Sequence, residues 1–272
     1  MKRILTLTLI LTGFLTAGLS PVFAQSESAR KAFQRGIKAY NEQRYKEALP
    51  DLMLAANAEI PEAYGPLVEM YVDGDYNGSG RGNYAEALKW VDKAADLYLG
   101  GKDSNGELVI LCLRDYNSLK FLTGEYESVA DLVPYHLSKG TPVPPYVLLQ
   151  LAASHMMLGN TAKAKEWIDK TKTEAQKENQ QLIVNYADML LAKMLFDNKE
   201  YDKAIDLLVS KNIVNLHPVS AYVYGASLIK TNNNPETGKQ WVQIASEYDY
   251  SGMVELNCFE KEIKQYWNSI KN

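Results

Sequence analysis

The chain has few of the residues from which metal sites and nucleophilic centres are built. Its 272 residues include two cysteines, Cys112 and Cys258, and three histidines, His136, His155 and His217. No histidine has another histidine, a cysteine or an acidic residue three or four positions away, which is the spacing that metal sites on helices use. We therefore expect no metal, no cofactor and no enzymatic activity.

A surplus of basic residues is also lacking. Lysine and arginine number 29 against 33 aspartates and glutamates, a formal net charge of −4. Proteins that bind nucleic acid present a basic face to the phosphates. The charge balance thus argues against a nucleic-acid partner.

Long apolar runs are absent except at the N-terminus. Lys2 and Arg3 precede an uncharged apolar run over residues 4–19, and Pro21 and Ala24 follow it. This order is typical of a secretory signal peptide, and we predict cleavage after residue 24. An uncleaved membrane anchor is the alternative, because about 18 apolar residues can begin to span a bilayer. The threonines and glycines in the run and its V-F-A ending favour cleavage.

The leader indicates an exported bacterial protein. No cysteine stands at the cleavage point, so a lipid anchor is not predicted. After cleavage we expect no transmembrane segment. The mature chain is therefore predicted to be periplasmic or secreted, with no prediction of its oligomeric state.

Six segments repeat one amphipathic helical pattern. They read QRYKEALPDLMLAA, GNYAEALKWVDKAADLYL, GEYESVADLVPYHL, GNTAKAKEWIDKTK, KEYDKAIDLLVSKN and NNPETGKQWVQIAS. The residues that precede the first helical turn, here called anchors, are Tyr45, Tyr84, Tyr126, Thr161, Tyr201 and Pro235. Successive anchors are 34 to 42 residues apart, and a fixed period of this length is typical of a solenoid.

The pattern is defined by the third and the seventh residue after each anchor. The third residue is mostly small, so that one helix can approach its partner: Ala48, Ala87, Val129, Ala164, Ala204 and Gly238. The seventh residue is apolar and covers the next turn of the same face: Leu52, Val91, Val133, Ile168, Leu208 and Val242. Trp90, Trp167 and Trp241 share one phase of the pattern, which favours packing over ligand binding.

A second amphipathic segment lies upstream of each copy. The turns between the two segments contain glycine or asparagine, as in LTGE, MLGN and FDNK, which end helices in the left-handed conformation. Residues placed at the predicted helix crossing are Gly36, Asn117, Ala152, Ala192 and Ala226. The unit is thus helix, turn, helix, and the fold class is all-α, because one hairpin buries its apolar face only against the next.

At this point the chain resembles the tetratricopeptide and Sel1-like repeat families. GIKAYNEQRYKEAL has the tetratricopeptide cadence, and AYGPLVEMYVDGDYNGSGRGNYAEALKWVDKAA is similar to a Sel1 repeat. The resemblance covers roughly residues 28–250. It implies a right-handed α-solenoid of about six repeats over residues 25–252, closed by a capping helix over residues 253–272.

The resemblance also implies that the first helix of each repeat lines a concave, ligand-binding face. The residues placed there are Phe33, Ile37, Tyr40, Arg114, Phe121, Tyr146, Met156, Tyr186, Met189, Lys193 and Phe196. Aromatic, thioether and basic groups together suit a peptide. The alternative is that several of these are core residues displaced by one position.

One loop, DGDYNGSGRGNY over residues 73–84, has part of a calcium motif. Asp73, Asp75 and Asn77 stand at alternate positions as in an EF-hand loop, but Tyr84 occupies the twelfth position, where the loop needs a bidentate glutamate. We interpret the segment as an exposed hairpin loop. Calcium binding is left open.

The expected function is a non-catalytic scaffold of the bacterial cell envelope that binds another protein or peptide along the concave face. The alternative is a carbohydrate- or small-ligand-binding module of a surface nutrient-uptake system. Its support is the tyrosine count of 18, since aromatic faces stack on sugars.

Overall fold

The chain is all-helical in the part that its structure describes. This computed structural model covers residues 27–99, 108, 115–138, 140, 142–250 and 256–271, and it has no β-strand in those ranges. The all-α prediction is confirmed. The predicted signal peptide, residues 1–24, lies outside the described residues. The chain divides into two compact units, Met1–Cys112 and Leu113–Asn272, which are described one at a time.

The first unit consists of helical hairpins. Its elements are a helix over residues 27–41, α2 (Tyr45–Asn57), η1 (Pro61–Ala63), α3 (Tyr64–Asp73) and α4 (Tyr84–Leu99). Helix α3 packs against both α2 and α4. The buried face contains Leu52, Leu67 and Val91, and the ring of Tyr64 lies edge-on to that of Trp90 with the centroids 6.3 Å apart.

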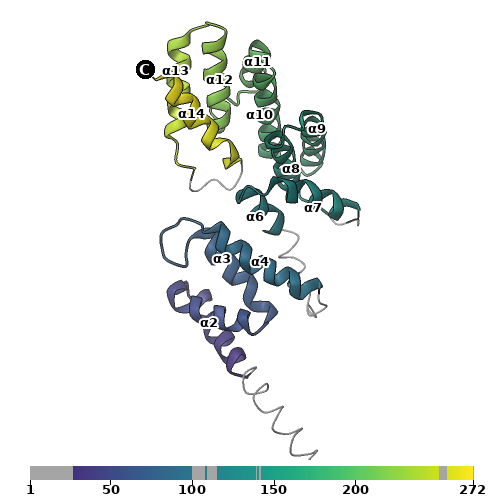
Figure 1. Ribbon diagram of the computed structural model, residues 1–272, viewed down its shortest axis with the longest axis vertical. Coiled ribbons are helices and arrows are strands. Elements are labelled where there is room, and N and C mark those ends of the chain that lie inside the picture. The colour runs from purple at the N-terminus through teal and green to yellow at the C-terminus, as the bar shows by residue number, and fades with distance from the viewer. Residues whose placement is uncertain are drawn as a thin grey trace, which may run out of the picture. The chain divides into compact units, whose positions relative to one another are not determined.

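The second unit continues the same alternation (Figure 1). Its elements are α6 (Asn117–Leu122), α7 (Tyr126–Ser138), α8 (Pro145–Met157), α9 (Thr161–Lys177), α10 (Gln181–Asp197), α11 (Tyr201–Ser210), α12 (Pro218–Lys230), α13 (Pro235–Glu247), η4 (Asn257–Phe259) and α14 (Glu260–Ile270). Each helix from α6 to α13 packs against the next one in the chain. The hairpins of this unit are therefore stacked in chain order.

The predicted register of the second helices is confirmed. Each of the six anchors is the first residue of a helix, namely of α2, α4, α7, α9, α11 and α13. Every residue three and seven positions after an anchor is buried. A helix of 3.6 residues per turn places these positions on one face, and that face is the one that packs.

The turns inside the hairpins contain a residue in the left-handed backbone conformation, which ends the first helix. Gly124 and Gly159 have φ angles of 83° and 72°, as the sequence predicts. In FDNK the left-handed residue is Lys199, with a φ of 65°, and not the neighbouring asparagine. The amide of Glu200 donates to the carbonyl of Leu195, five residues earlier, at 2.9 Å. This is the hydrogen bond that closes a helix end after a left-handed residue. The position of the left-handed residue is therefore set by the geometry of the turn and not by the type of residue.

Helices α12 and α13 approach each other closely at a pair of glycines. A Cβ atom placed on Gly225 would lie 2.5 Å from the carbonyl oxygen of Gly238. Gly238 is the predicted small residue of this repeat. Its partner is Gly225, whereas the sequence placed the crossing at Ala226, which is also buried.

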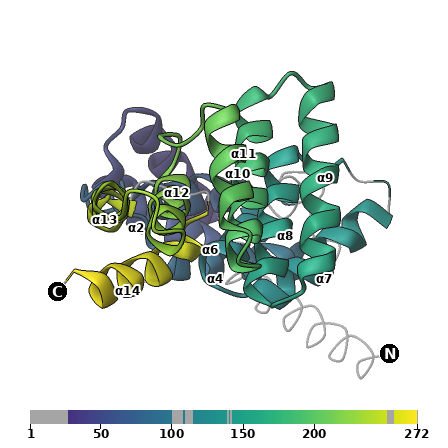
Figure 2. The same cartoon turned by 90° about the horizontal axis from the view of Figure 1, so that it is seen from above.

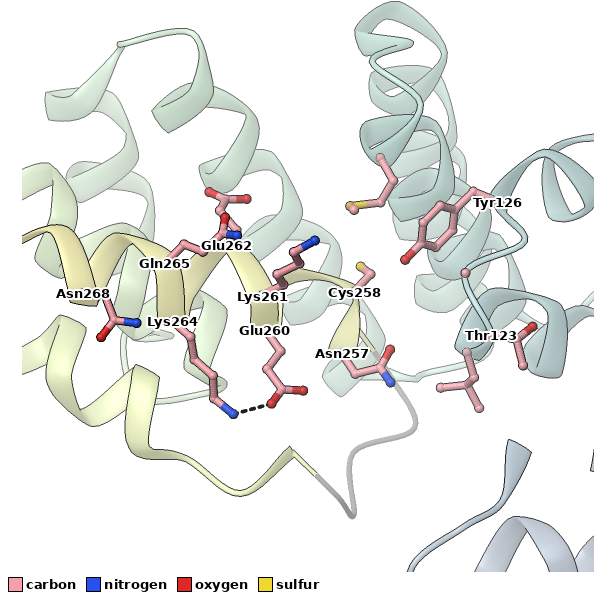
Figure 3. Close-up of a pocket in the computed structure, with 13 residues that line it drawn as sticks. Thr123, Tyr126, Asn257, Cys258, Glu260, Lys261, Glu262, Lys264, Gln265 and Asn268 are labelled. Carbon is pink, nitrogen blue, oxygen red and sulfur yellow. Dashed lines mark hydrogen bonds and ion pairs between the residues drawn. The ribbon is translucent and has the colours of Figure 1, made fainter. Parts of the chain in front are cut away.

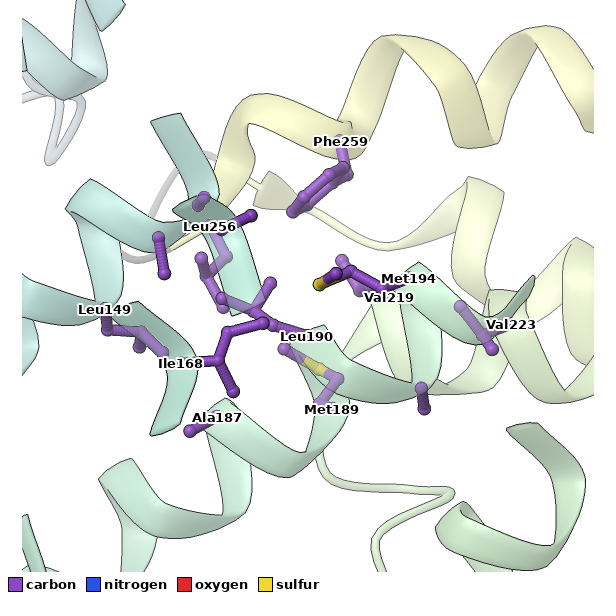
Figure 4. Packing of buried hydrophobic residues seen from close by; sticks show 14 of the residues in the cluster. Leu149, Ile168, Ala187, Met189, Leu190, Met194, Val219, Val223, Leu256 and Phe259 are labelled. Carbon is purple, nitrogen blue, oxygen red and sulfur yellow. The ribbon is translucent and has the colours of Figure 1, made fainter. Parts of the chain in front are cut away.

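The core of the second unit is continuous from α6 to α14. Figure 4 shows part of it, with Leu149 of α8, Ile168 of α9 and Leu190 of α10 pointing toward one another. Trp167 and Trp241 are half-buried and pack against this cluster, in agreement with the packing interpretation. None of the helices in the described ranges is both long and apolar enough to span a bilayer.

The C-terminal helix α14 reaches back along the unit. It packs on α13, and its Glu262 bonds to Tyr222 of α12 and to Lys193 of α10. Figure 2, seen from above, shows α14 running crosswise to α12 and α13. The helix predicted near the C-terminus is present, and it lies across first helices of the hairpins.

Candidate functional site

Several residues predicted for the concave face form the corners of hairpins. Tyr40, Phe121 and Phe196 each stand five residues before an anchor tyrosine. The ring pairs Tyr40–Tyr45, Phe121–Tyr126 and Phe196–Tyr201 have centroids 5.7, 5.8 and 5.5 Å apart. These rings therefore stabilise the turn between the two helices of a hairpin.

Four of the predicted groove residues lie in the interior of the second unit. Phe121, Met189, Lys193 and Phe196 are at most 9% exposed. Tyr146, Met156 and Tyr186 are half-buried against the same cluster. The physical reason is that α8 and α10 are covered on most of their circumference, so positions assigned to an open face are packed instead.

The remaining predictions concern the first unit. Phe33, Ile37 and Tyr40 are half-buried on the helix over residues 27–41, and the hydroxyl of Tyr40 donates to Glu69 at 2.6 Å. Burial and Glu69 raise the pKa of Tyr40. Arg114 lies outside the described residues.

A cleft of the second unit lies beside α14. It has a volume of about 850 Å³ and is lined by the turn after α6, by Tyr126, by Met157 at the end of α8, and by residues of the segment 257–268 (Figure 3). Lining residues from Asn257 to Asn268 span about 16 Å at 1.5 Å per helical residue. The cleft is thus long enough for an extended segment of about five residues.

The walls of this cleft combine apolar and hydrogen-bonding groups. Met157 lines the cleft and is 41% exposed. Asn257, Gln265 and Asn268 offer amides that both donate and accept, as the main chain of a peptide requires. Glu260 pairs with Lys264 within α14. The surface is therefore suited to a polypeptide segment with an apolar side chain for Met157.

Tyr126 and Cys258 are the groups of the cleft with shifted pKa values. Burial raises the pKa of Tyr126 to about 12, with a smaller contribution from Cys258. Burial also raises the pKa of the Cys258 thiol. A nucleophilic cysteine needs a lowered pKa, so Cys258 is a protonated thiol at neutral pH and contributes packing.

A buried ammonium group, that of Lys193, lies under α14 and is paired with two partly exposed carboxylates. The ammonium group of Lys193 is 2.7 and 2.8 Å from the two carboxylate oxygens of Asp197, and 3.1 Å from Oε1 of Glu262. Burial raises the pKa of Asp197, Lys193 opposes the rise and Glu262 adds to it. The hydroxyl of Tyr222 donates to the same Glu262 oxygen at 2.9 Å.

The loop with the partial calcium motif is held by hydrogen bonds of its main-chain amides. The side chain of Asn77 accepts from the amide of Ser79 at 2.9 Å, and the amide of Asn83 donates to the carbonyl of Tyr71 at 2.7 Å. Gly74 has a φ of 75°, and a Cβ there would lie 2.3 Å from the amide nitrogen of Arg81. Among the described residues no group of three or more His, Cys, Asp or Glu side chains is arranged to hold a metal ion.

Sequence reasoning missed two parts of this site. Met157 is one residue from the predicted Met156 and is the one that faces the cleft. Tyr222 was not selected, although it stands on a first helix as the other predicted residues do. The amphipathic stripe of Phe259, Ile263 and Tyr266 was visible in the C-terminal segment, but not which helices it covers.

No protein-family model matches the chain, and no curated protein and no solved structure matches it either.

Proposed function

We propose that this chain is an exported scaffold that binds a segment of another protein. In this proposal the hairpins form a right-handed α-solenoid of about six tetratricopeptide- or Sel1-like repeats, closed by a C-terminal capping helix. The identical phase of the six second helices supports the repeat assignment. The signal-like leader supports a periplasmic or secreted location. Binding, and not catalysis, is the proposed activity.

The observation that carries the proposal is the cleft beside α14. Its length, its amide-rich wall and its exposed Met157 match what a peptide segment presents: main-chain hydrogen-bonding groups and alternating apolar side chains. Methionine adapts its shape to irregular apolar partners. A partner would be held by the ends of α6 and α8 on one side and by α14 on the other.

The test is site-specific photo-crosslinking in living cells. A photoreactive phenylalanine analogue replaces Met157, and in a matched control it replaces Val209, which is 54% exposed on α11 and away from the cleft. We expect a covalent adduct to one defined protein from position 157 and none from position 209. Equal adducts from both positions, or none from position 157, would contradict the proposal. Binding of the purified chain to a glycan array would favour the carbohydrate alternative instead.

A further inference from the structure

Two stripes of α14 have different surroundings. Phe259 and Ile263 are 2% and 0% exposed and belong to the core of the second unit. A second stripe lines the cleft beside α14 and consists of Cys258, Lys261, Gln265 and Asn268. Their spacing places these four residues on one side of the helix. The first stripe fixes α14 in place, and the second can meet a partner while α14 stays where it is.

The charged groups that line this cleft are paired, with one exception. Glu260 pairs with Lys264 in the same helix, and Glu262 pairs with Lys193 of α10. Lys261 is exposed and has no ion-pair partner in the part of the chain that the structure describes. Figure 3 shows its side chain leaving α14 on the side away from the Glu260–Lys264 pair. The cleft therefore presents one ammonium group that no carboxylate of the described residues neutralises.

A hydrogen-bond donor belongs to the other wall of the cleft. The hydroxyl of Tyr126 on α7 has no hydrogen-bond partner among the described residues, and Figure 3 shows it turned toward α14. Burial raises the pKa of Tyr126 to about 12, so the hydroxyl keeps its proton at neutral pH. An ammonium group and a phenol hydroxyl both donate, and a carboxylate accepts from either. Together they favour an acidic group on the partner.

The neighbours of Lys261 limit the charge of that acidic group. Glu260 and Glu262 flank it in the chain, and both are partly exposed. A phosphate monoester or a nucleic acid would bring more than one negative charge close to these carboxylates, and the described residues that line the cleft include no arginine to offset it. A carboxylate brings a single negative charge, which Lys261 balances. The side chains of aspartate and glutamate meet this requirement.

We propose that the segment bound in the cleft carries an aspartate or glutamate whose carboxylate pairs with Lys261, and beside it an apolar residue that packs on Met157. This inference rests on the proposed function and specifies the partner as an acidic segment. It needs no movement of α14, because Lys261 and Met157 already line the cleft.

The test repeats the photo-crosslinking from position 157 in chains with altered charge. An ion pair at an exposed site is worth up to about fivefold in affinity. We expect Lys261→Gln to lower the adduct yield by about that factor, and Lys261→Glu to lower it further, because repulsion replaces attraction. Lys211→Glu is the matched control. It changes the net charge equally at an exposed lysine at the end of α11, away from the cleft, and should leave the yield unchanged.

The adduct also identifies the acidic residue. Mass spectrometry locates the partner residue that is joined to position 157. We expect an aspartate or glutamate within about three residues of it, since three extended residues span roughly 10 Å. Changing that acidic residue to lysine should lower the adduct yield with the unaltered chain and restore it with Lys261→Glu. A crosslinked segment without an acidic residue in that range, or a charge reversal that does not restore the adduct, would overturn the inference.

The outcomes separate this inference from the proposed function. An adduct that forms equally with Lys261→Glu overturns the inference and leaves binding of a protein segment in the cleft standing. Absence of any adduct from position 157 in a chain that retains Lys261 refutes both. Equal losses in Lys261→Glu and Lys211→Glu would assign the effect to overall charge and also overturn the inference. Because Lys261 is exposed, the melting temperature of the Lys261→Glu chain should match that of the unaltered chain, which excludes a folding defect.

Discussion

The two helices of each hairpin in the second unit bury very different shares of their residues. Ten of the 13 residues of α8 are buried, against four of the 17 residues of α9. The pair α12 and α13 shows the same contrast, ten of 13 against four of 13. First helices are covered by their own partner, by neighbouring hairpins and, for α10 and α12, by α14. Second helices have one packed face and one face exposed to solvent.

The largest expected effect comes from cutting a cavity in a first helix. Leu149 of α8 is fully buried, and Leu149→Ala should lower the free energy of unfolding by about 2–5 kcal/mol, because the lost burial and the cavity add. Val209→Ala on the second helix α11 should change it by less than about 0.5 kcal/mol. Chemical denaturation of both variants measures the difference. Similar losses of unfolding free energy in the two variants would contradict the contrast between first and second helices.

The contact between a first and a second helix should tolerate no added atoms. Gly225→Ala places a methyl group 2.5 Å from the carbonyl oxygen of Gly238, so the two helices must move apart. We expect a loss of about 1–3 kcal/mol, measured by thermal unfolding. Gly65→Ala is the matched control: no atom lies within 4 Å of the added carbon in α3, and a small gain of about 0.5–1 kcal/mol is expected. A neutral Gly225→Ala would contradict the described approach.

At the hairpin corners we expect one substitution to increase the stability. Lys199 adopts a left-handed conformation that disfavours residues with a Cβ atom. Lys199→Gly should raise the stability by about 0.5–1 kcal/mol, since relief of the strain exceeds the entropy that glycine adds to the unfolded chain. Gly159→Ala at the corresponding corner should lower it by about 1 kcal/mol. Effects of the same sign in both variants would show that the corners are not equivalent.

The smallest expected effect is a pH dependence from a first helix. Burial lowers the pKa of His155, Lys163 acts in the same direction, and Glu166 opposes them. A histidine with a lowered pKa binds its proton better in the unfolded chain, so stability present above about pH 6.5 is lost as the pH falls below that value. Between pH 7 and 5 the melting temperature should fall less in His155→Gln than in the unaltered chain. The difference is expected to be on the order of 1–2 °C, and parallel curves would refute it.

The same contrast explains what could be read from the sequence. Second helices are amphipathic, so residues such as Ala164 and Ile168 define a face, and this buried side was predicted correctly. Each of these helices begins at its anchor, one residue earlier than predicted. First helices are apolar on nearly all sides. Their period therefore marks a helix without indicating which side is open, and Met189 and Phe196 were assigned to a groove although they are buried.

The candidate site was less predictable for a further reason. Glu262 meets Lys193 and Tyr222 only because α14 turns back over helices that lie far earlier in the chain. Local spacing contains no information on such a contact. The cleft at Met157 depends on the same placement, so a local pattern could suggest the helix but not the site that it helps to form.

Amide hydrogen exchange, resolved by mass spectrometry along the full chain, tests the central claim most directly. If the hairpins stack with the first helices inside, the amides of α8, α10 and α12 should exchange more slowly than those of α9, α11 and α13. Equal or slower exchange in the second helices would contradict this arrangement of the second unit.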